Sequence, residues 1–184
     1  MNTKTAMHFA HSYLLRPYNP LTVNLIGAGG TGSQMLTALA RINESLVALG
    51  PPGLQLTLFD DDAVTEANLS RQLFAACELG LPKAVALINR VNRFFGTNWK
   101  AVTERFNQTT VSRLPEHGRA NIFVSCVDTV AARYEIAAML KEFKTVHETG
   151  RNRALYWMDC GNAQYTGQAI LSTVSDILQP KSAQ

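Results

Sequence analysis

Cysteine is scarce in this 184-residue sequence: only Cys77, Cys126 and Cys160 occur, and no two of them form a Cys-x-x-Cys pair. Because the cysteines are few and odd in number, they argue against a disulfide framework and against a four-cysteine zinc site. Long apolar runs are also missing, because no window approaches the ~18 consecutive apolar residues of a membrane helix. The first 20 residues lack the apolar core of a signal peptide. We therefore expect a protein of the reducing cytoplasm that has no membrane partner.

Charge of one sign is not in large excess either. Charged residues make up 17% of the sequence and the formal net charge is +3, with lysine and arginine spread along the chain. This mild basic excess does not indicate nucleic-acid binding, and it suits an anionic small ligand or an acidic partner equally well. Hydrophobic residues make up 46% of the chain, which is enough for the core of one domain.

Short apolar runs alternate with amphipathic segments along the chain. Strands are predicted at residues 21–26, 54–59, 98–106, 121–127, 154–160 and 167–174. Helices are predicted at 33–49, 81–95 and 129–144, with short helices within 63–80 and at 109–115, and a polar loop at 147–153. The first long helix has one apolar stripe, formed by Met35, Leu39, Ile42, Leu46 and Leu49.

This alternation of strands and helices predicts right-handed crossovers. The expected fold is α/β: a doubly wound, mostly parallel, Rossmann-like sheet with helices on both faces. We expect one domain over residues 21–184, preceded by an N-terminal arm of residues 1–20.

A glycine-rich loop lies directly between the first predicted strand and the first long helix. Gly27, Gly29 and Gly32 match G-x-G-x-x-G, in which the glycines permit a tight turn, a close phosphate and close helix–strand packing. The helix N-terminus adds N–H donors and the positive end of a dipole. Asp60 ends the next strand and is placed to hydrogen-bond a ribose hydroxyl. The loop alone does not separate ATP from NAD, although Asp60 follows Gly32 by 28 residues (60 − 32) rather than the usual ~20.

Charged and polar residues beyond the second predicted strand favour a nucleoside triphosphate, whose phosphates attract cations and whose magnesium takes carboxylates. Ligands gather at the carboxyl ends of parallel strands, where this set is expected to lie. The set consists of Asp60, Asp62, Asn68, Arg71, Gln72, Lys83 and Asp128. Plainer interpretations stay open for single members. Arg71 and Lys83 could be solvated surface charges, and Asp62 and Asp128 could be helix caps. Asn68 could be a turn residue.

Taken in order, these motifs resemble the adenylation domain of the ThiF/MoeB and ubiquitin-activating enzyme family. The matching pieces are GAGGTG at 27–32, D-x-D-x-V-x-x-x-N-L-x-R-Q at 60–72, G-x-x-K at 80–83, C-x-D at 126–128 and GNAQYTGQ at 161–168. The resemblance runs from about residue 21 to residue 174. The long first helix, its PPG turn and ANLSRQLF are most similar to the ThiF-like proteins of plasmid-borne PRTRC gene systems.

The resemblance implies an adenylyltransferase. Its reaction would be ATP-dependent adenylation of the C-terminal glycine carboxylate of a small ubiquitin-like or sulfur-carrier-like protein, and its expected partners also include a conjugating-enzyme-like protein and a second copy of the chain. Asp128 would hold magnesium and would be catalytic together with Arg71 and Lys83. The implied ATP contacts are Gly27, Gly29, Gly30, Gly32, Asp60, Asp62, Asn68, Arg71, Gln72 and Lys83. The family often has asparagine where Thr129 stands, which puts a neighbouring hydrogen bond in doubt.

The sequence also departs from the family. Many relatives carry a nucleophilic cysteine and a Cys-x-x-Cys zinc site further along, and neither is visible here. We interpret Cys126 and Cys160 as buried structural cysteines, and Cys77 is undecided. The chain is either a fragment that lacks a C-terminal catalytic-cysteine and partner-binding region, or a protein that passes its adenylate directly to a partner. Two other functions stay open: a catalytically inactive nucleotide-binding partner subunit and an NAD-dependent oxidoreductase.

Overall fold

The computed structural model describes residues 7–145, 153–162 and 165–179. Its six-stranded sheet has the order β3-β2-β1-β4-β5-β6. The strands are β1 (Leu21–Ile26), β2 (Leu54–Phe59), β3 (Lys100–Val102), β4 (Ile122–Ser125), β5 (Tyr156–Asn162) and β6 (Gly167–Thr173). The helices are α1 (Ser12–Leu15), α2 (Gly30–Ala48), α3 (Lys83–Phe95), α4 (Gln108–Arg113), α5 (Pro115–Gly118) and α6 (Val130–Thr145), and two 3₁₀ turns span Glu66–Asn68 and Ala76–Glu78.

Every strand pair in the sheet is parallel except β5–β6. The carboxyl ends of β1, β2 and β4 therefore lie at one edge, because Ile26 is in register with both Phe59 and Ser125. The strand order reverses direction at β1 and β4, which is the switch point where ligands bind in open α/β sheets. The prediction of a doubly wound, mostly parallel α/β fold is confirmed.

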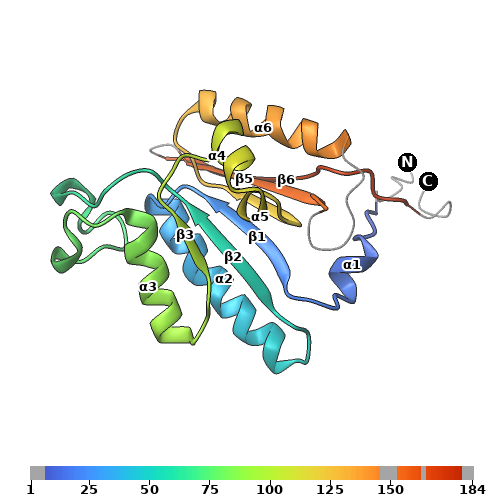
Figure 1. Ribbon diagram of the computed structural model, residues 1–184, viewed down its shortest axis with the longest axis horizontal. Coiled ribbons are helices and arrows are strands. Elements are labelled where there is room, and N and C mark those ends of the chain that lie inside the picture. The colour runs from blue at the N-terminus through green and yellow to red at the C-terminus, as the bar shows by residue number, and fades with distance from the viewer. Residues whose placement is uncertain (1–6, 146–152, 163–164, 180–184) are drawn as a thin grey trace.

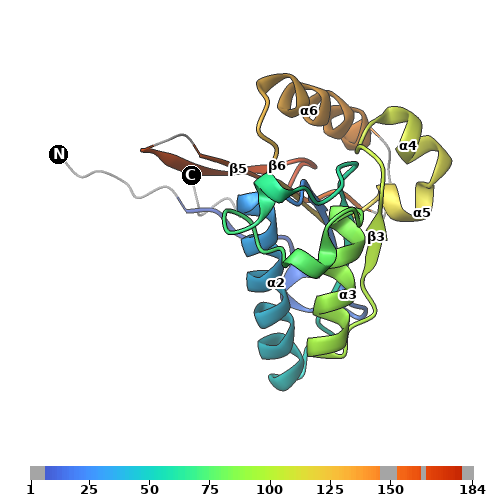
Figure 2. The same ribbon diagram turned by 90° about the vertical axis from the view of Figure 1, so that its left-hand side faces the viewer.

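Helices cover both faces of the sheet (Figures 1 and 2). One core lies between the sheet and helices α2 and α3, and Leu25, Leu36 and Leu58 are fully buried in it. A second core, which includes Phe123 and Ile136, lies between the sheet and helices α4, α5 and α6. Burial of β1, β2 and β4 on both faces explains why their sequences are rich in apolar residues, and even the polar Asn24 and Thr57 among them are buried.

Two predicted elements need correction. The strand expected at 98–106 is only Lys100–Val102, because Phe106 turns back into the second core and packs edge-on against Phe59 with ring centroids 5.0 Å apart. The stripe expected on α2 is only half right, since Ile42 is 49% and Leu49 81% exposed, whereas Met35, Leu39 and Leu46 are partly buried.

The buried face of α2 consists instead of Gly32, Ser33, Leu36, Ala40 and Asn43. Asn43 is buried because its Oδ1 accepts the N–H of Leu54 at 2.7 Å and so caps the start of β2. Small and polar residues form much of the contact, and an apolar stripe therefore does not mark it.

The two ends of the domain lie side by side. Phe9 N–H donates to Gln179 Oε1 at 2.8 Å, and His8 Nε2 lies 2.9 Å from the Tyr156 hydroxyl. Of the polar loop expected at 147–153, only Arg153 is described, and Ala163 and Gln164 of the GNAQYTGQ motif also lie outside the described residues. No helix in the described part of the chain is long and apolar enough to cross a membrane.

Candidate functional site

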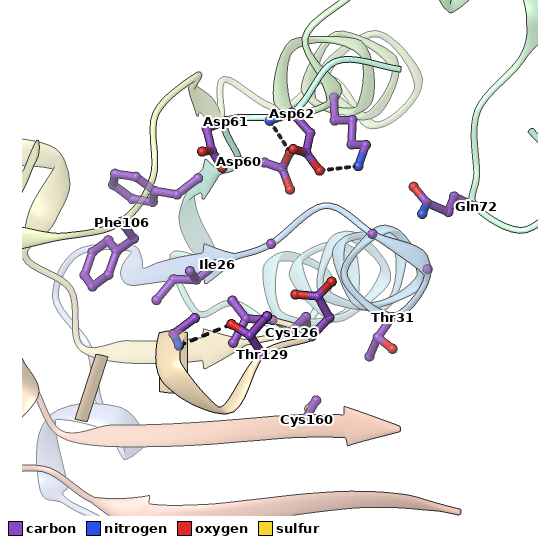
Figure 3. Close-up of a pocket in the computed structure, with 18 of the residues that line it drawn as sticks. Ile26, Thr31, Asp60, Asp61, Asp62, Gln72, Phe106, Cys126, Thr129 and Cys160 are labelled. Carbon is purple, nitrogen blue, oxygen red and sulfur yellow. Dashed lines mark hydrogen bonds and ion pairs between the residues drawn. The ribbon is translucent and has the colours of Figure 1, made fainter. Parts of the chain in front are cut away.

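A cavity of about 910 Å³ lies at the carboxyl edge of the sheet (Figure 3). It extends from the end of β2 across the glycine loop to the end of β5. Nine of the eleven residues expected at the site line it, namely Gly27, Gly29, Gly30, Asp60, Asp62, Arg71, Gln72, Lys83 and Asp128. The sequence motifs, which are spread over more than half of the chain, thus meet in one cavity.

The glycine loop has backbone geometry that side chains would disrupt. Gly27 has a φ of +95°, and a Cβ on Gly32 would lie 1.9 Å from the Gly27 carbonyl oxygen, so Gly32 permits the close helix–strand packing expected of the third glycine. A Cβ on Gly29 would meet nothing within 4 Å. Gly29 is the N-cap of α2 and no side chain caps this helix, which leaves its first N–H groups available to an anion.

Asp60 joins the end of β2 to the glycine loop. Its Oδ2 accepts the Ala28 N–H at 2.6 Å, and its Oδ1 accepts the Asp62 N–H at 3.0 Å. Burial raises the pKa of the Asp60 carboxyl, and these two hydrogen bonds and the Lys83 charge partly offset that rise. Asp60 therefore holds the loop in place while one side of its carboxylate faces the cavity.

Lys83 is not the solvated surface charge that the sequence left open, because only 6% of the residue is exposed. Its Nζ lies 2.6 Å from Asp62 Oδ2, and its backbone N–H donates to the Asp62 carbonyl at 2.9 Å. The Asp62 side chain is 66% exposed. Lys83 thus presents a buried ammonium to the cavity and is held at the N-terminus of α3 by the Asp62 side chain at the rim.

Arg71 and Gln72 lie in the segment after the 3₁₀ turn Glu66–Asn68, which packs against the start of α2. A Cβ on Gly30 would lie 3.6 Å from the Arg71 carbonyl oxygen, so the two segments are in contact. The exposed Arg71 side chain donates from Nε to the Ala67 carbonyl at 3.0 Å. Gln72 Oε1 is buried and has no hydrogen-bond partner among the described residues, which is the state of an acceptor that a ligand donor would satisfy.

Asn68 does not line the cavity. Its Oδ1 accepts the backbone N–H of Thr65 at 2.8 Å and the Thr65 hydroxyl at 2.9 Å, which closes the 3₁₀ turn before Arg71. The turn interpretation therefore describes its observed contacts, and any effect of Asn68 on a ligand would act through the position of Arg71 and Gln72.

Asp128 follows β4, is exposed and lines the cavity. It is not the cap of α6, because Thr129 Oγ1 accepts the Ala132 N–H at 3.3 Å from the capping position. The described residues contain no group of three His, Cys, Asp or Glu side chains that could hold a metal ion by themselves. A single carboxylate still suits magnesium, which usually takes one or two carboxylates together with phosphate oxygens and water.

The cavity is also lined by residues that the sequence motifs do not include. Ile26, Phe59, Phe106 and Val127 form an apolar wall, and the first two could have been found as the last residues of their strands. Arg105 and Arg133 also line the cavity. Arg105 lies 3.7 Å from Glu135 on α6, and neither arginine belongs to a pattern that places it at the edge of the sheet.

Cys126 and Cys160 lie beside each other at the cavity floor. Burial raises the pKa of the Cys126 thiol to about 12 and also raises that of Cys160. Both are therefore protonated near neutral pH and poor nucleophiles, which agrees with a structural interpretation. Cys77 is exposed and lies outside the cavity.

Comparison with known proteins places the chain among the ThiF proteins. The family model described as "ThiF family" matches residues 9–179. A ubiquitin-like modifier-activating enzyme 5 from Drosophila ananassae is 30% identical over 151 residues, which is 76% of this chain and 33% of that protein. The enzyme of the same name from Drosophila willistoni is 32% identical over 133 residues, or 66% of this chain and 30% of that protein. The chain thus spans about a third of the length of these curated relatives.

Solved structures show the same fold. The crystal structure of E. coli tRNA N6-threonylcarbamoyladenosine dehydratase, TcdA, matches with a TM-score of 0.54 and 23% identity, over 66% of this chain and 48% of that one. The same enzyme in complex with ATP matches with a TM-score of 0.54 and 22% identity, over 66% and 47% of the two chains. The fold, the glycine loop at its switch point and the match over residues 9–179 establish that this chain belongs to the ThiF family.

Proposed function

We propose that this chain binds ATP in the cavity and adenylates the C-terminal glycine carboxylate of a small ubiquitin-like or sulfur-carrier-like protein. One observation carries the proposal. The uncapped N-terminus of α2, the buried ammonium of Lys83 and the carboxylates of Asp60 and Asp128 all face the same cavity at the switch point of the sheet. An NAD site would need the loop and Asp60 but not this set of cations and acids.

The nucleotide would occupy the cavity from its apolar wall to the glycine loop. Phe59 and Phe106 offer the base an apolar surface next to β2, and the Asp60 carboxylate would accept a ribose hydroxyl. The first N–H groups of α2 would bind the phosphates, together with the Arg71 guanidinium and the Lys83 ammonium. Gln72 would accept a hydrogen bond through its buried, unpartnered Oε1.

The chemistry needs positioning more than proton transfer. The glycine carboxylate is ionised at pH 7, so it attacks the α-phosphorus without a general base. A bond forms between the carboxylate oxygen and phosphorus, and the bond from the α-phosphorus to the β-phosphate oxygen breaks as pyrophosphate leaves. Arg71 and Lys83 would neutralise the charge that develops on the leaving group. Asp128 would hold magnesium, which supplies further neutralisation when it is bound.

The acyl substrate rests on the names of the relatives and on the motif resemblance. The relatives are called ubiquitin-like modifier-activating enzymes, which supports a ubiquitin-like partner. A homodimer, a conjugating-enzyme-like partner, a cytoplasmic location and the PRTRC subfamily stay predictions. The alternative of an inactive nucleotide-binding subunit is less favoured, because Arg71, Lys83 and Asp128 all line the cavity.

Exchange of radiolabelled pyrophosphate into ATP tests the proposal. The protein is incubated with ATP, magnesium and a panel of ubiquitin-like proteins that end in glycine, each paired with a form from which that glycine has been removed. We expect exchange with at least one intact member and none with its truncated form. A protein that binds ATP but supports no exchange with any member would favour the inactive-subunit alternative.

A further inference from the structure

Arg133, in the first turn of α6, has a more constrained side chain than the other arginines of the cavity. Its Nη2 donates to the Val127 carbonyl at 2.9 Å, and its Nε lies 3.3 Å from Asp159 Oδ2. The guanidinium also packs closely against Gly161, where an added Cβ would come within 2.6 Å of Nη2 and 3.2 Å of Cζ. Three different segments thus fix the orientation of one cationic group.

The Asp159 carboxylate, which pairs with Arg133, is itself held in place by hydrogen bonding within the sheet. Asp159 is buried, and its Oδ1 accepts the Ser125 hydroxyl at 2.6 Å. Ser125 Oγ in turn accepts the Trp157 indole N–H at 2.8 Å. This network lies between α6 and the ends of β4 and β5, where it orients the carboxylate toward the arginine.

Arg133 lines the cavity, but its counterion Asp159 does not. Arg133 is a lining residue and its side chain is 23% exposed, whereas Asp159 is not among the lining residues. The guanidinium has five N–H donors in a planar fork, and among the described residues only Nη2 donates a hydrogen bond, to the Val127 carbonyl. Nε lies 3.3 Å from the Asp159 carboxylate but is buried without a described hydrogen-bond partner, and the Nη1 donors have no described partner either.

The position of Arg133 decides which part of a ligand it can reach. Asp60 and the aromatic part of the apolar wall, Phe59 and Phe106, lie at the β2 side of the cavity, whereas Arg133 contacts Asp159 and Gly161 of β5. Figure 3 shows Asp60 and Cys160, which also belongs to β5, on opposite sides of β1. Three interstrand spacings separate β2 from β5 in the sheet order, which is about 14 Å. A nucleoside monophosphate held at Asp60 would therefore leave this side of the cavity to other groups.

We propose that Arg133 is an oxyanion-binding residue for the groups that lie beyond the α-phosphorus, and that Asp159 is its positioning residue. This inference rests on the proposed function. The oxyanion is either the terminal phosphates of ATP or the carboxylate of the acyl substrate, because a guanidinium binds both through the same forked geometry. Loss of such charged hydrogen bonds corresponds to roughly a 10- to 100-fold loss of affinity.

Calorimetry on the full chain with three probes tests the proposal. The probes are ATP with magnesium, AMP, and glycyl-sulfamoyl adenosine, a stable analogue of a glycyl adenylate. The variants are Arg133→Gln, Arg133→Lys and Asp159→Asn. The matched control is Lys141→Gln, which removes one positive charge from an exposed position of the same helix outside the cavity.

We expect Arg133→Gln to retain AMP affinity and to bind ATP, the analogue or both ~10- to 100-fold more weakly. Loss for ATP alone assigns the terminal phosphates, and loss for the analogue alone assigns the acyl group. Asp159→Asn should weaken binding of the same probe, relative to AMP, by a smaller factor. Arg133→Lys should lose less of that affinity than Arg133→Gln does. A purely structural role would weaken all three probes alike.

Equal losses for all three probes, or no loss for any, would overturn the inference, as would Lys141→Gln reproducing the effect. Failure of the wild-type protein to bind ATP or AMP would instead remove the proposed function and the inference with it. The two failures are therefore distinguishable in the same experiment.

Discussion

Asp128→Asn tests whether the carboxylate at the end of β4 serves the chemistry. Asp128 is exposed and Thr129 caps α6 in its place, so the change should cost about 0.5 kcal/mol of folding stability or less. For a chain of this size that is a melting-temperature shift of about 2 °C at most. If the carboxylate holds magnesium against the departing pyrophosphate, exchange should fall at least ~100-fold, because loss of even one preorganised donor has that effect.

Thr129→Ala is the matched control on the adjacent residue. It removes the cap that Thr129 Oγ1 provides to the Ala132 N–H, which should cost about 1 kcal/mol and lower the melting temperature by about 2–4 °C. Exchange per folded molecule should persist. The assay is pyrophosphate exchange at saturating magnesium, alongside thermal unfolding of each variant. Full exchange activity in Asp128→Asn would refute the metal role, since asparagine keeps the size of the side chain and loses only its charge.

Four further predictions follow from the geometry of the fold and the site. Gly29→Ala should fold normally but bind ATP weakly, whereas Gly32→Ala should be strongly destabilised by its clash with the loop; thermal unfolding and calorimetry on both variants check this, and normal ATP affinity in Gly29→Ala would contradict it. Asp60→Ala should raise the KM for ATP more than it lowers kcat, and a normal KM with a collapsed kcat would contradict the ribose role. Because the folded-state pKa of Asp60 is raised, its contribution to stability is present at low pH and lost as pH rises through that pKa, so the stability of wild type relative to Asp60→Asn should fall over that window in urea titrations. Iodoacetamide should label Cys77 well before Cys126, whose pKa of about 12 leaves only about one thiolate in 10,000 at pH 8; equal labelling rates, read by mass spectrometry, would refute the burial argument.

Much of the fold is predictable because its determinants are local. The apolar runs of β1, β2 and β4 are buried on both faces, so their sequences differ clearly from the amphipathic helices between them. The glycine loop is predictable because Gly27 and Gly32 meet backbone constraints that other residues cannot. Asp60 and Asp128 are predictable because strand ends of a parallel sheet meet at one edge.

The remaining features of the fold and of the site depend on contacts between segments that are distant in the sequence. Arg133 meets Asp159 only because β4 and β5 pair in parallel with Ser125 opposite Asp159. Phe106 reaches the cavity because the chain after β3 turns back against Phe59, and no spacing pattern in the sequence marks that turn. The apolar stripe mispredicts the buried face of α2 for a similar reason, since Asn43 is buried by its hydrogen bond to Leu54 rather than by apolarity.

Side-by-side titration of ATP with magnesium and of NAD tests the central claim most directly. The cations and acids at the cavity distinguish a triphosphate site from a dinucleotide site, and calorimetry reads that distinction without knowledge of the protein substrate. We expect saturable binding of ATP, weakened in both Lys83→Met and Asp60→Ala, and no heat from NAD over the same concentration range. Binding of NAD with no response to ATP would contradict the account and would favour an oxidoreductase.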